Sequence, residues 1–251
     1  MHIIYPLLIS SIAGLSTVIG AFLIFLKIKP VYLNKFISFC LAFSLSIMLS
    51  ISIFDLIPSS FFPILTAFGL RKTVIILLFS FLISYIVITL LNTLIKKETE
   101  NQDLFRLGIL NMLVLILHNL PEGIATFLSS YHDIHLGLKL GIAIMLHNIP
   151  EGISIAIPIY YSTKSKYKAF KTTFLSGLAE PIGAILAFLF LKNYVSNLMV
   201  SIVLIIVAGL MITLSIQEIL PASLKYHENK FIYLGFLIGL LIFSLNFILT
   251  T

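Results

Sequence analysis

The residues with the clearest capacity for chemistry lie in two short segments with the order histidine, asparagine, any residue, proline, glutamate, glycine. These segments are LHNLPEGIA at 117–125 and LHNIPEGIS at 146–154, both inside apolar runs. In each, the glutamate follows the histidine by four residues, so both side chains project from one face of a helix. Two such helices packed side by side could surround a divalent cation with two imidazoles and two carboxylates, a ligand set suited to zinc or another first-row metal. The ligands would be His118, Glu122, His147 and Glu151.

The same segments offer ligands for a second, neighbouring metal position. Asn119 and Asn148 directly follow the histidines and could supply amide oxygens, while Glu122 and Glu151 could bridge the two positions. We expect Glu180, in the apolar segment GLAEPIGA, to complete the second position. The alternative for Glu180 is a single buried carboxyl group that is protonated and hydrogen-bonded.

The prolines of the doubled motif indicate an irregular, hydrated region in the middle of the membrane. Pro121 and Pro150 each remove a backbone donor from a helix interior and bend its axis. Such backbone is tolerated at membrane depth only where protein or a wet cavity satisfies it. A lone histidine in a membrane helix more often forms a helix-to-helix hydrogen bond. Identical spacing of four residue types in consecutive spans has no packing purpose that we can name, so it favours a metal site.

The composition predicts the elements that carry these residues. Hydrophobic residues make up 59% of the 251-residue chain and charged residues 10%, and the mean hydropathy is +1.12. A soluble domain has about 25% charged residues, so a soluble enzyme is excluded. We predict an all-α integral membrane protein with a single polytopic membrane domain over residues 1–251. Its eight helices are predicted at 4–26, 35–57, 73–95, 105–130, 137–161, 169–191, 196–217 and 231–250.

The basic residues predict how these spans are oriented. Alternate connections hold 12 of the 16 lysines and arginines, and the other connections hold 4. Because cytoplasmic loops are the basic ones, both termini are expected outside the cytoplasm. This orientation explains the formal charge of +6, so no nucleic-acid partner is expected; the lipid bilayer is the expected surrounding.

An internal repeat relates the two ends of the chain. Residues 12–23 match residues 175–186, and residues 52–60 match residues 215–223, both at an offset of 163. The matched spans cross the membrane in opposite senses, which is typical of transporters with a binding site near the midplane. We therefore predict an inverted repeat of helices 1–3 and 6–8 around helices 4 and 5, a 3+2+3 arrangement.

The second match pairs two acidic residues, Asp55 and Glu218. They are candidate pathway residues at the two mouths of one route through the protein. The alternative for each is a solvated carboxylate at a helix end.

These motifs resemble the ZIP family (Zrt/Irt-like proteins), most closely its ZupT-like bacterial branch. The resemblance rests on the doubled HNxPEG, on SGLAEPIGA and GLSTVIGA, and on QEILP, and it covers nearly the whole chain. It implies eight helices in a cell (inner) membrane, both ends extracytoplasmic, and uptake of zinc, iron, manganese, cobalt or cadmium with no organic cofactor. It also implies homodimers and an elevator-like sliding of helices 1, 4, 5 and 6. The chain departs from many members in having no histidine-rich linker between helices 3 and 4.

In relatives, a binuclear centre is implied for the matching residues. One metal would be held by His118, Glu122, His147 and Glu151, and the other by Asn119, Asn148, the two glutamates and Glu180.

The leading hypothesis is therefore a divalent transition-metal importer. The alternative is a membrane-embedded metalloenzyme, a di-iron oxidase or an intramembrane protease, in which the same ligands would activate oxygen or water. The protease spacing H-E-x-x-H is absent from the sequence, which argues against that alternative. An exporter would differ only in direction, on which these residues are silent.

Overall fold

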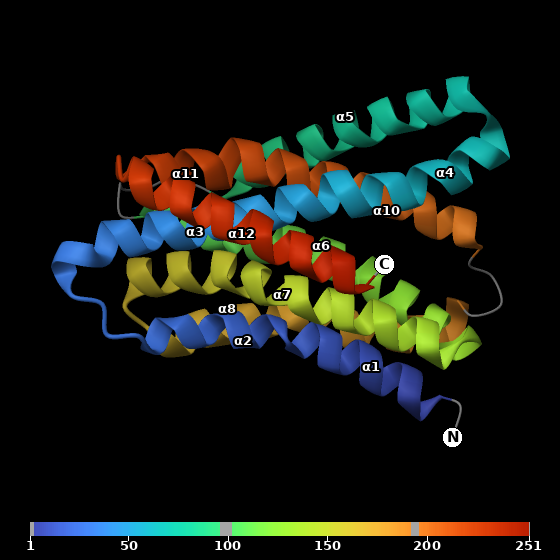
Figure 1. Cartoon of the computed structure of the whole chain (residues 1–251), viewed down its shortest axis with the longest axis horizontal. Coiled ribbons are helices and arrows are strands. Elements are labelled where there is room, and N and C mark those ends of the chain that lie inside the picture. The colour runs from blue at the N-terminus through green and yellow to red at the C-terminus, as the bar shows by residue number, and fades with distance from the viewer. Residues whose placement is uncertain (1–2, 96–101, 192–195, 251) are drawn as a thin grey trace.

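A computed structural model describes residues 3–95, 102–191 and 196–250 of the chain. Its elements run roughly along one long axis (Figure 1). In chain order they are α1 (Ile4–Leu15), α2 (Thr17–Ala21), η1 (Phe22–Phe25), η2 (Pro30–Tyr32), α3 (Leu33–Ile51), η3 (Ser52–Leu56), α4 (Ile57–Phe68), α5 (Leu70–Leu94), α6 (Gln102–His132), α7 (Ile134–Thr163), α8 (Lys166–Gly177), α9 (Ala179–Leu186), η4 (Ala187–Leu191), α10 (Asn197–Leu214), η5 (Ser215–Ile219), α11 (Leu220–Leu224) and α12 (Asn229–Thr250).

The described residues contain eight helical stretches that are long and apolar enough to cross a membrane, which confirms the all-α class and the eight spans. They are Ile4–Phe25, Pro30–Phe68, Leu70–Leu94, Asp103–Tyr131, Ile134–Thr163, Lys166–Phe190, Leu198–Leu224 and Asn229–Ile248.

The two largest differences between the predicted and the observed span boundaries are at the ends of the second and seventh spans. The second span was predicted to end at residue 57 and the seventh at residue 217, but they continue to Phe68 and Leu224. Each contains a π-helical segment, η3 or η5, directly before a proline-containing turn. A π-helical turn shifts the hydrogen-bond register, so the helix passes the proline where the sequence indicated a break. These two segments are separated by the same 163 residues as the sequence repeat.

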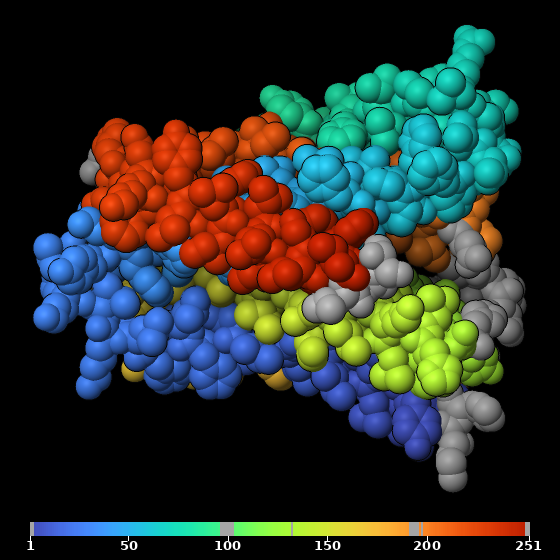
Figure 2. Space-filling view, viewed as in Figure 1, coloured from blue at the N-terminus to red at the C-terminus, as the bar shows by residue number. Residues whose placement is uncertain are grey.

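Helix packing brings together elements from distant parts of the chain. The two motif helices, α6 and α7, pack against each other; α9 packs on α6, and α2 packs on α7. Around them, α5 packs on α10 and α12 packs on α3. In Figure 2 the red α12 covers much of α3 from this side. The motif helices therefore have protein neighbours on several sides.

Glycines in the doubled motif allow backbones to touch. A Cβ atom on Gly123 would lie 2.1 Å from the carbonyl oxygen of Glu180, and one on Gly152 would lie 1.8 Å from that of Thr17. Such close approach of membrane helices requires the smallest residue. Thr17 and Glu180 are 163 residues apart, so the α7–α2 and α6–α9 contacts occur at equivalent positions of the sequence repeat.

A buried asparagine compensates for a helix-interior proline. Pro158 has no N–H, so the carbonyl oxygen of Ser154 loses its usual donor within α7. The side chain of Asn111, on α6, donates to this oxygen through Nδ2 at 2.8 Å. Because both groups are buried, this bond fixes α6 against α7 at a point on the side of the motif opposite to the α6–α7 connection.

Candidate metal centre

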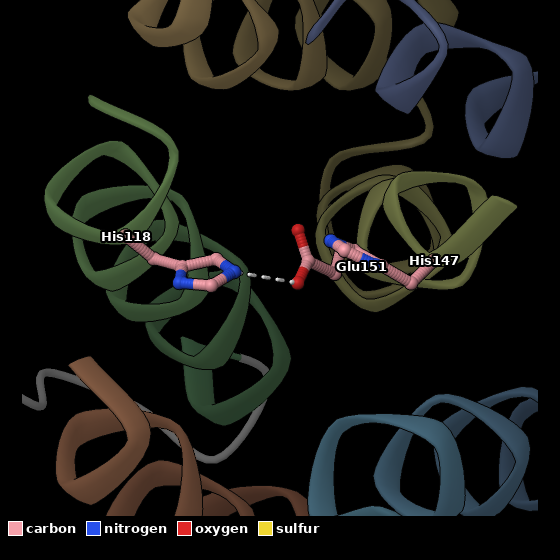
Figure 3. Close-up of side chains that lie close together, drawn as sticks. All are labelled: His118, His147 and Glu151. Carbon is pink, nitrogen blue, oxygen red and sulfur yellow. Dashed lines mark ion pairs between the residues drawn. The ribbon is translucent and has the colours of Figure 1, made fainter. Parts of the chain in front are cut away.

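Four residues of the doubled motif face one another across α6 and α7. In Figure 3 the His118 ring points from α6 toward Glu151 of α7, with His147 beside it. Nε2 of His118 lies 3.4 Å from Oε1 of Glu122 and 3.4 Å from Oε1 of Glu151. Nε2 of His147 lies 3.4 Å from Oε1 of Glu122. In a tetrahedral zinc site with bonds near 2.0–2.1 Å, ligand atoms are about 3.3–3.4 Å apart. The separations match the edges of such a coordination shell.

This cluster is buried, and two of its four side chains have no hydrogen-bond partner among the described residues, whereas His147 and Glu122 share a hydrogen bond of 3.5 Å. His118 and Glu151 are 0% exposed, Glu122 4% and His147 5%. Within the described ranges, neither ring nitrogen of His118 and neither carboxylate oxygen of Glu151 has a hydrogen-bond partner. An unpaired buried polar group costs about 1–3 kcal/mol and more when charged, so native proteins rarely keep one without a reason. A divalent cation between the helices would compensate these groups.

Ligand atoms of His118, His147 and Glu151 all lie within 4.8 Å of one another, close enough to hold a single metal ion. Glu122 contacts both imidazoles but is outside that group of three.

The residues predicted for a second metal position are buried next to this cluster. Nδ2 of Asn148 donates to the carbonyl oxygen of Ala13 at 2.9 Å and also to Oε1 of Glu180. Nδ2 of Asn119 donates to the carbonyl oxygen of Ser176 at 3.5 Å. Each amide nitrogen therefore donates to a backbone carbonyl oxygen of a neighbouring helix, α1 for Asn148 and α8 for Asn119. Among the residues described, the Oδ1 atoms of Asn119 and Asn148 and Oε2 of Glu180 have no hydrogen-bond partner. These are the oxygens that a cation would need.

A cavity connects Asp55 with the cluster. It has a volume of about 650 Å³ and is lined by Asp55, Glu122 and His147 together with residues of α6, α7 and α10. The α6 residues that line it extend to Ser129, near the end of α6 that connects to α7. Asp55 thus shares one continuous space with two of the candidate metal ligands.

Glu218 lies in a different polar cluster, near the other end of α6. Nη2 of Arg106 lies 3.0 Å from Oε2 of Glu218, and Nδ2 of Asn92 donates to Oε1. Beside them, Nζ of Lys225 lies 3.0 Å from a carboxylate oxygen of Asp103. These ion pairs join the start of α6 to η5 and to the residue after α11.

Sequence reasoning missed Arg106 and Asn92 as partners of Glu218. Both lie more than 100 residues from Glu218, at separations of 112 and 126, so no local spacing pattern signals the pairing.

Fold and cluster together define a class: a polytopic helical membrane protein with imidazoles and carboxylates buried at its centre. Residues 95–246 match the family model described as ZIP Zinc transporter. The chain is 34% identical to the zinc transporter ZupT of Oceanobacillus iheyensis over 266 residues, covering 99% of this chain and 98% of that protein. It is 34% identical to ZupT of Streptococcus mutans, covering 99% and 98%, and 36% identical to ZupT of Chlorobium limicola, covering 97% of each.

The chain therefore belongs to the ZIP family. It is a multi-pass membrane transporter of divalent metal ions, and not an enzyme, which sets aside the metalloenzyme alternative.

Proposed function

We propose that this transporter imports zinc into the cytoplasm through a binuclear centre between α6, α7 and α9. The observation that carries the proposal is the set of 3.4 Å separations between imidazole nitrogens and carboxylate oxygens inside a buried cluster. The names of the relatives, all zinc transporters, support zinc as the transported ion. Iron, manganese, cobalt and cadmium are further candidates, because nitrogen and oxygen ligands accept them too.

In this proposal, His118, Glu122, His147 and Glu151 hold the first ion. The second ion lies against Asn119, Asn148 and Glu180, and the two motif glutamates bridge both ions. The free oxygens of the two asparagines and of Glu180 support this division. Zinc binds neutral imidazole and ionised carboxylate, so loading the centre expels protons held by these groups.

The proposed pathway of the ion runs between the polar residues at the two ends of α6. Zinc enters the cavity past Asp55 and reaches Glu122 and His147 without further rearrangement. At the other end of α6, a separate cavity of about 460 Å³ is lined by the residues of the Arg106–Glu218 and Asp103–Lys225 pairs and by none of the cluster residues, so these pairs form the inner gate of the proposed route. Glu218 therefore acts as a gate residue that must leave Arg106 before the ion is released. An inverted 3+2+3 repeat, supported by the contacts at the offset of 163, supplies the two alternating states.

The Asp55 end is placed outside the cytoplasm by the lysine and arginine distribution, together with both termini. This orientation in a cell (inner) membrane makes the described state open to the outside. The proposal also includes a homodimer, which is supported only by the resemblance to the ZIP family.

The proposal is tested in liposomes that contain the purified chain and an internal zinc-sensitive dye. We expect zinc uptake by the parent protein and a loss of at least tenfold in the His147→Ala and Glu151→Ala variants. His135→Ala is the matched control, because it removes an exposed histidine outside the cluster and keeps uptake. Parental uptake rates in the two cluster variants would exclude the centre from the pathway. Competition by other metals, with and without a proton gradient, measures selectivity and coupling in the same assay.

A further inference from the structure

A further cavity, remote from the metal centre, lies where the chain passes from η1 to η2 and from α7 to α8. Its volume is about 380 Å³, and its polar lining comes from Lys27, Lys164, Lys166, Tyr160 and Tyr161. No aspartate or glutamate lines it, and none of its residues lines the cavity that contains Asp55. The cavity therefore carries three positive charges and no compensating negative charge.

Two of the three lysine side chains of this cavity contact aromatic rings. Nζ of Lys166 lies 4.5 Å from the ring centre of Phe25, and Nζ of Lys164 lies 5.1 Å from that of Tyr161. Cation–π contacts of this kind orient an ammonium group without neutralising it. In the part of the chain that the structure describes, no carboxylate forms an ion pair with Lys27, Lys164 or Lys166. Their charge remains available to an anion.

The turn between α7 and α8 has an unusual backbone at this place. Lys164 adopts the left-handed conformation, with φ of 54°, and its N–H donates to the carbonyl oxygen of Tyr160 at 2.7 Å. Glycine or asparagine normally occupies such a helix end, because other side chains are strained there. The next helix, α8, has 12 residues and begins at Lys166, so its positive N-terminal end also faces this region.

Exposed apolar side chains surround the cavity, as expected for a lipid-binding site at the edge of a membrane. Phe22, Phe25 and Leu26 are 57%, 51% and 50% exposed, and they lie at the end of the first span. A basic pocket beside exposed apolar side chains at a span end suits an anionic headgroup with its acyl chains alongside. We propose that this cavity binds the phosphate group of an anionic phospholipid, held by Lys27, Lys164 and Lys166. The basic loops at this end place it on the cytoplasmic leaflet.

A bound headgroup would touch several parts of the molecule at once. The lining includes Phe25 of η1, Leu33 of α3 and Tyr160 of α7. The lipid would thus link the first, second and fifth spans at their shared end.

Native mass spectrometry of the detergent-purified full chain tests the proposal with added phosphatidylglycerol, and with phosphatidylcholine of the same acyl chains. We expect the parent to retain phosphatidylglycerol in preference. The Lys164→Gln/Lys166→Gln variant should bind it about 25-fold more weakly, or about fivefold per lysine, which corresponds to about 1 kcal/mol each. The matched control is Lys168→Gln/Lys171→Gln, which removes the same charge from exposed positions of α8 outside the cavity and should change binding by less than twofold.

Lys164→Arg/Lys166→Arg keeps the charge and should retain the lipid, which separates loss of charge from loss of fold. Equal phosphatidylglycerol affinity in the pocket and control variants overturns the proposal. Inorganic phosphate is titrated into delipidated protein as a further arm. Displacement of bound phosphatidylglycerol by phosphate supports a shared phosphate site, whereas tight phosphate binding with no lipid retention overturns the lipid as its source.

Discussion

The two motif glutamates are not equivalent in their contacts. Oε1 of Glu122 lies 3.4 Å from Nε2 of His118 and 3.4 Å from Nε2 of His147, whereas the ion-pair contact of Glu151 at this distance is to His118. Glu122 also lines the cavity that leads from Asp55, while Glu151 is fully buried. In the proposed route, Glu122 would therefore meet an entering ion first, and Glu151 would hold it deeper.

Replacing either glutamate by alanine should weaken zinc binding strongly, because even changes in groups that only support a metal ligand cost about 10–100-fold in affinity. We expect a loss of at least 100-fold for Glu122→Ala and for Glu151→Ala, measured by competition with a zinc-chelating dye. Glu122→Ala should in addition slow the association of zinc, which stopped-flow mixing would measure. His135→Ala serves as the control and should bind zinc like the parent. An unchanged affinity in either glutamate variant would remove that residue from the centre.

At the scale of residues, the sequence predicted which side chains approach one another across α6 and α7. A four-residue spacing fixes the face of a helix, and the identical motif in two consecutive spans makes those faces meet. The same reasoning could not find the Arg106–Asn92–Glu218 cluster, because these partners come from three separate helical elements. Tertiary packing alone determines that meeting.

Helical elements in this protein are joined through backbone polar groups and small residues. The hydrogen bond from Asn111 to the carbonyl oxygen of Ser154 is one such junction, and the Gly152–Thr17 contact is another. The membrane explains why spans were predictable: each must be apolar over a fixed length, so eight runs were visible in the sequence. It does not dictate where a span ends beyond the bilayer, so the π-helical turns before Pro58 and Pro221 were missed.

Asn111→Leu should destabilise the protein by about 1–3 kcal/mol, because it leaves a buried carbonyl oxygen without a donor. The measurement is the midpoint of thermal unfolding in detergent. Pro158→Ala restores a backbone N–H at position 158 that can donate to the carbonyl oxygen of Ser154, so Asn111→Leu should cost much less in that background. Equal losses in both backgrounds would show that Asn111 does not act through the proline gap.

Gly152→Ala should also lower stability, here by about 1–3 kcal/mol, because the added Cβ would lie 1.8 Å from the carbonyl oxygen of Thr17 and push α7 away from α2. The same thermal measurement applies. Gly141→Ala on the same helix is the comparison and should cost less, since the atoms its Cβ would meet belong to the side chain of Ile9 and not to a backbone. Similar stability in the parent and Gly152→Ala would show that the close approach is not required.

On the scale of the whole molecule, both ends contain a cavity, but the two cavities differ in whether they reach the cluster: the one of about 460 Å³ beside Glu218 is lined by none of the cluster residues. The cavity of about 650 Å³ reaches the cluster from the end where α6 meets α7. At the opposite end, two ion pairs with 3.0 Å separations connect α6 to its neighbours. This difference between the ends was not visible in the sequence, because the repeat relates the two ends and would by itself make them alike.

The open end can be identified by chemical labelling. Ser129 lines the cavity, so Ser129→Cys in a Cys40→Ala background should react with a membrane-impermeant thiol reagent added from outside the cell. Zinc should slow this reaction severalfold, because the ion occupies the same space. Ala222→Cys, in the cavity at the opposite end, should react only in inverted vesicles. The reverse pattern of sidedness would reverse the predicted orientation.

The touching backbones around Gly123 and Gly152 carry a consequence for motion. Four helices in such contact have little freedom to bend separately. In the proposed transport cycle, α2, α6, α7 and α9 would therefore shift as one rigid unit with the ion bound between them. The energy barrier to transport would then lie at the interface of this unit with α3 and α10. The coordination geometry of the ion would be preserved from one side of the membrane to the other.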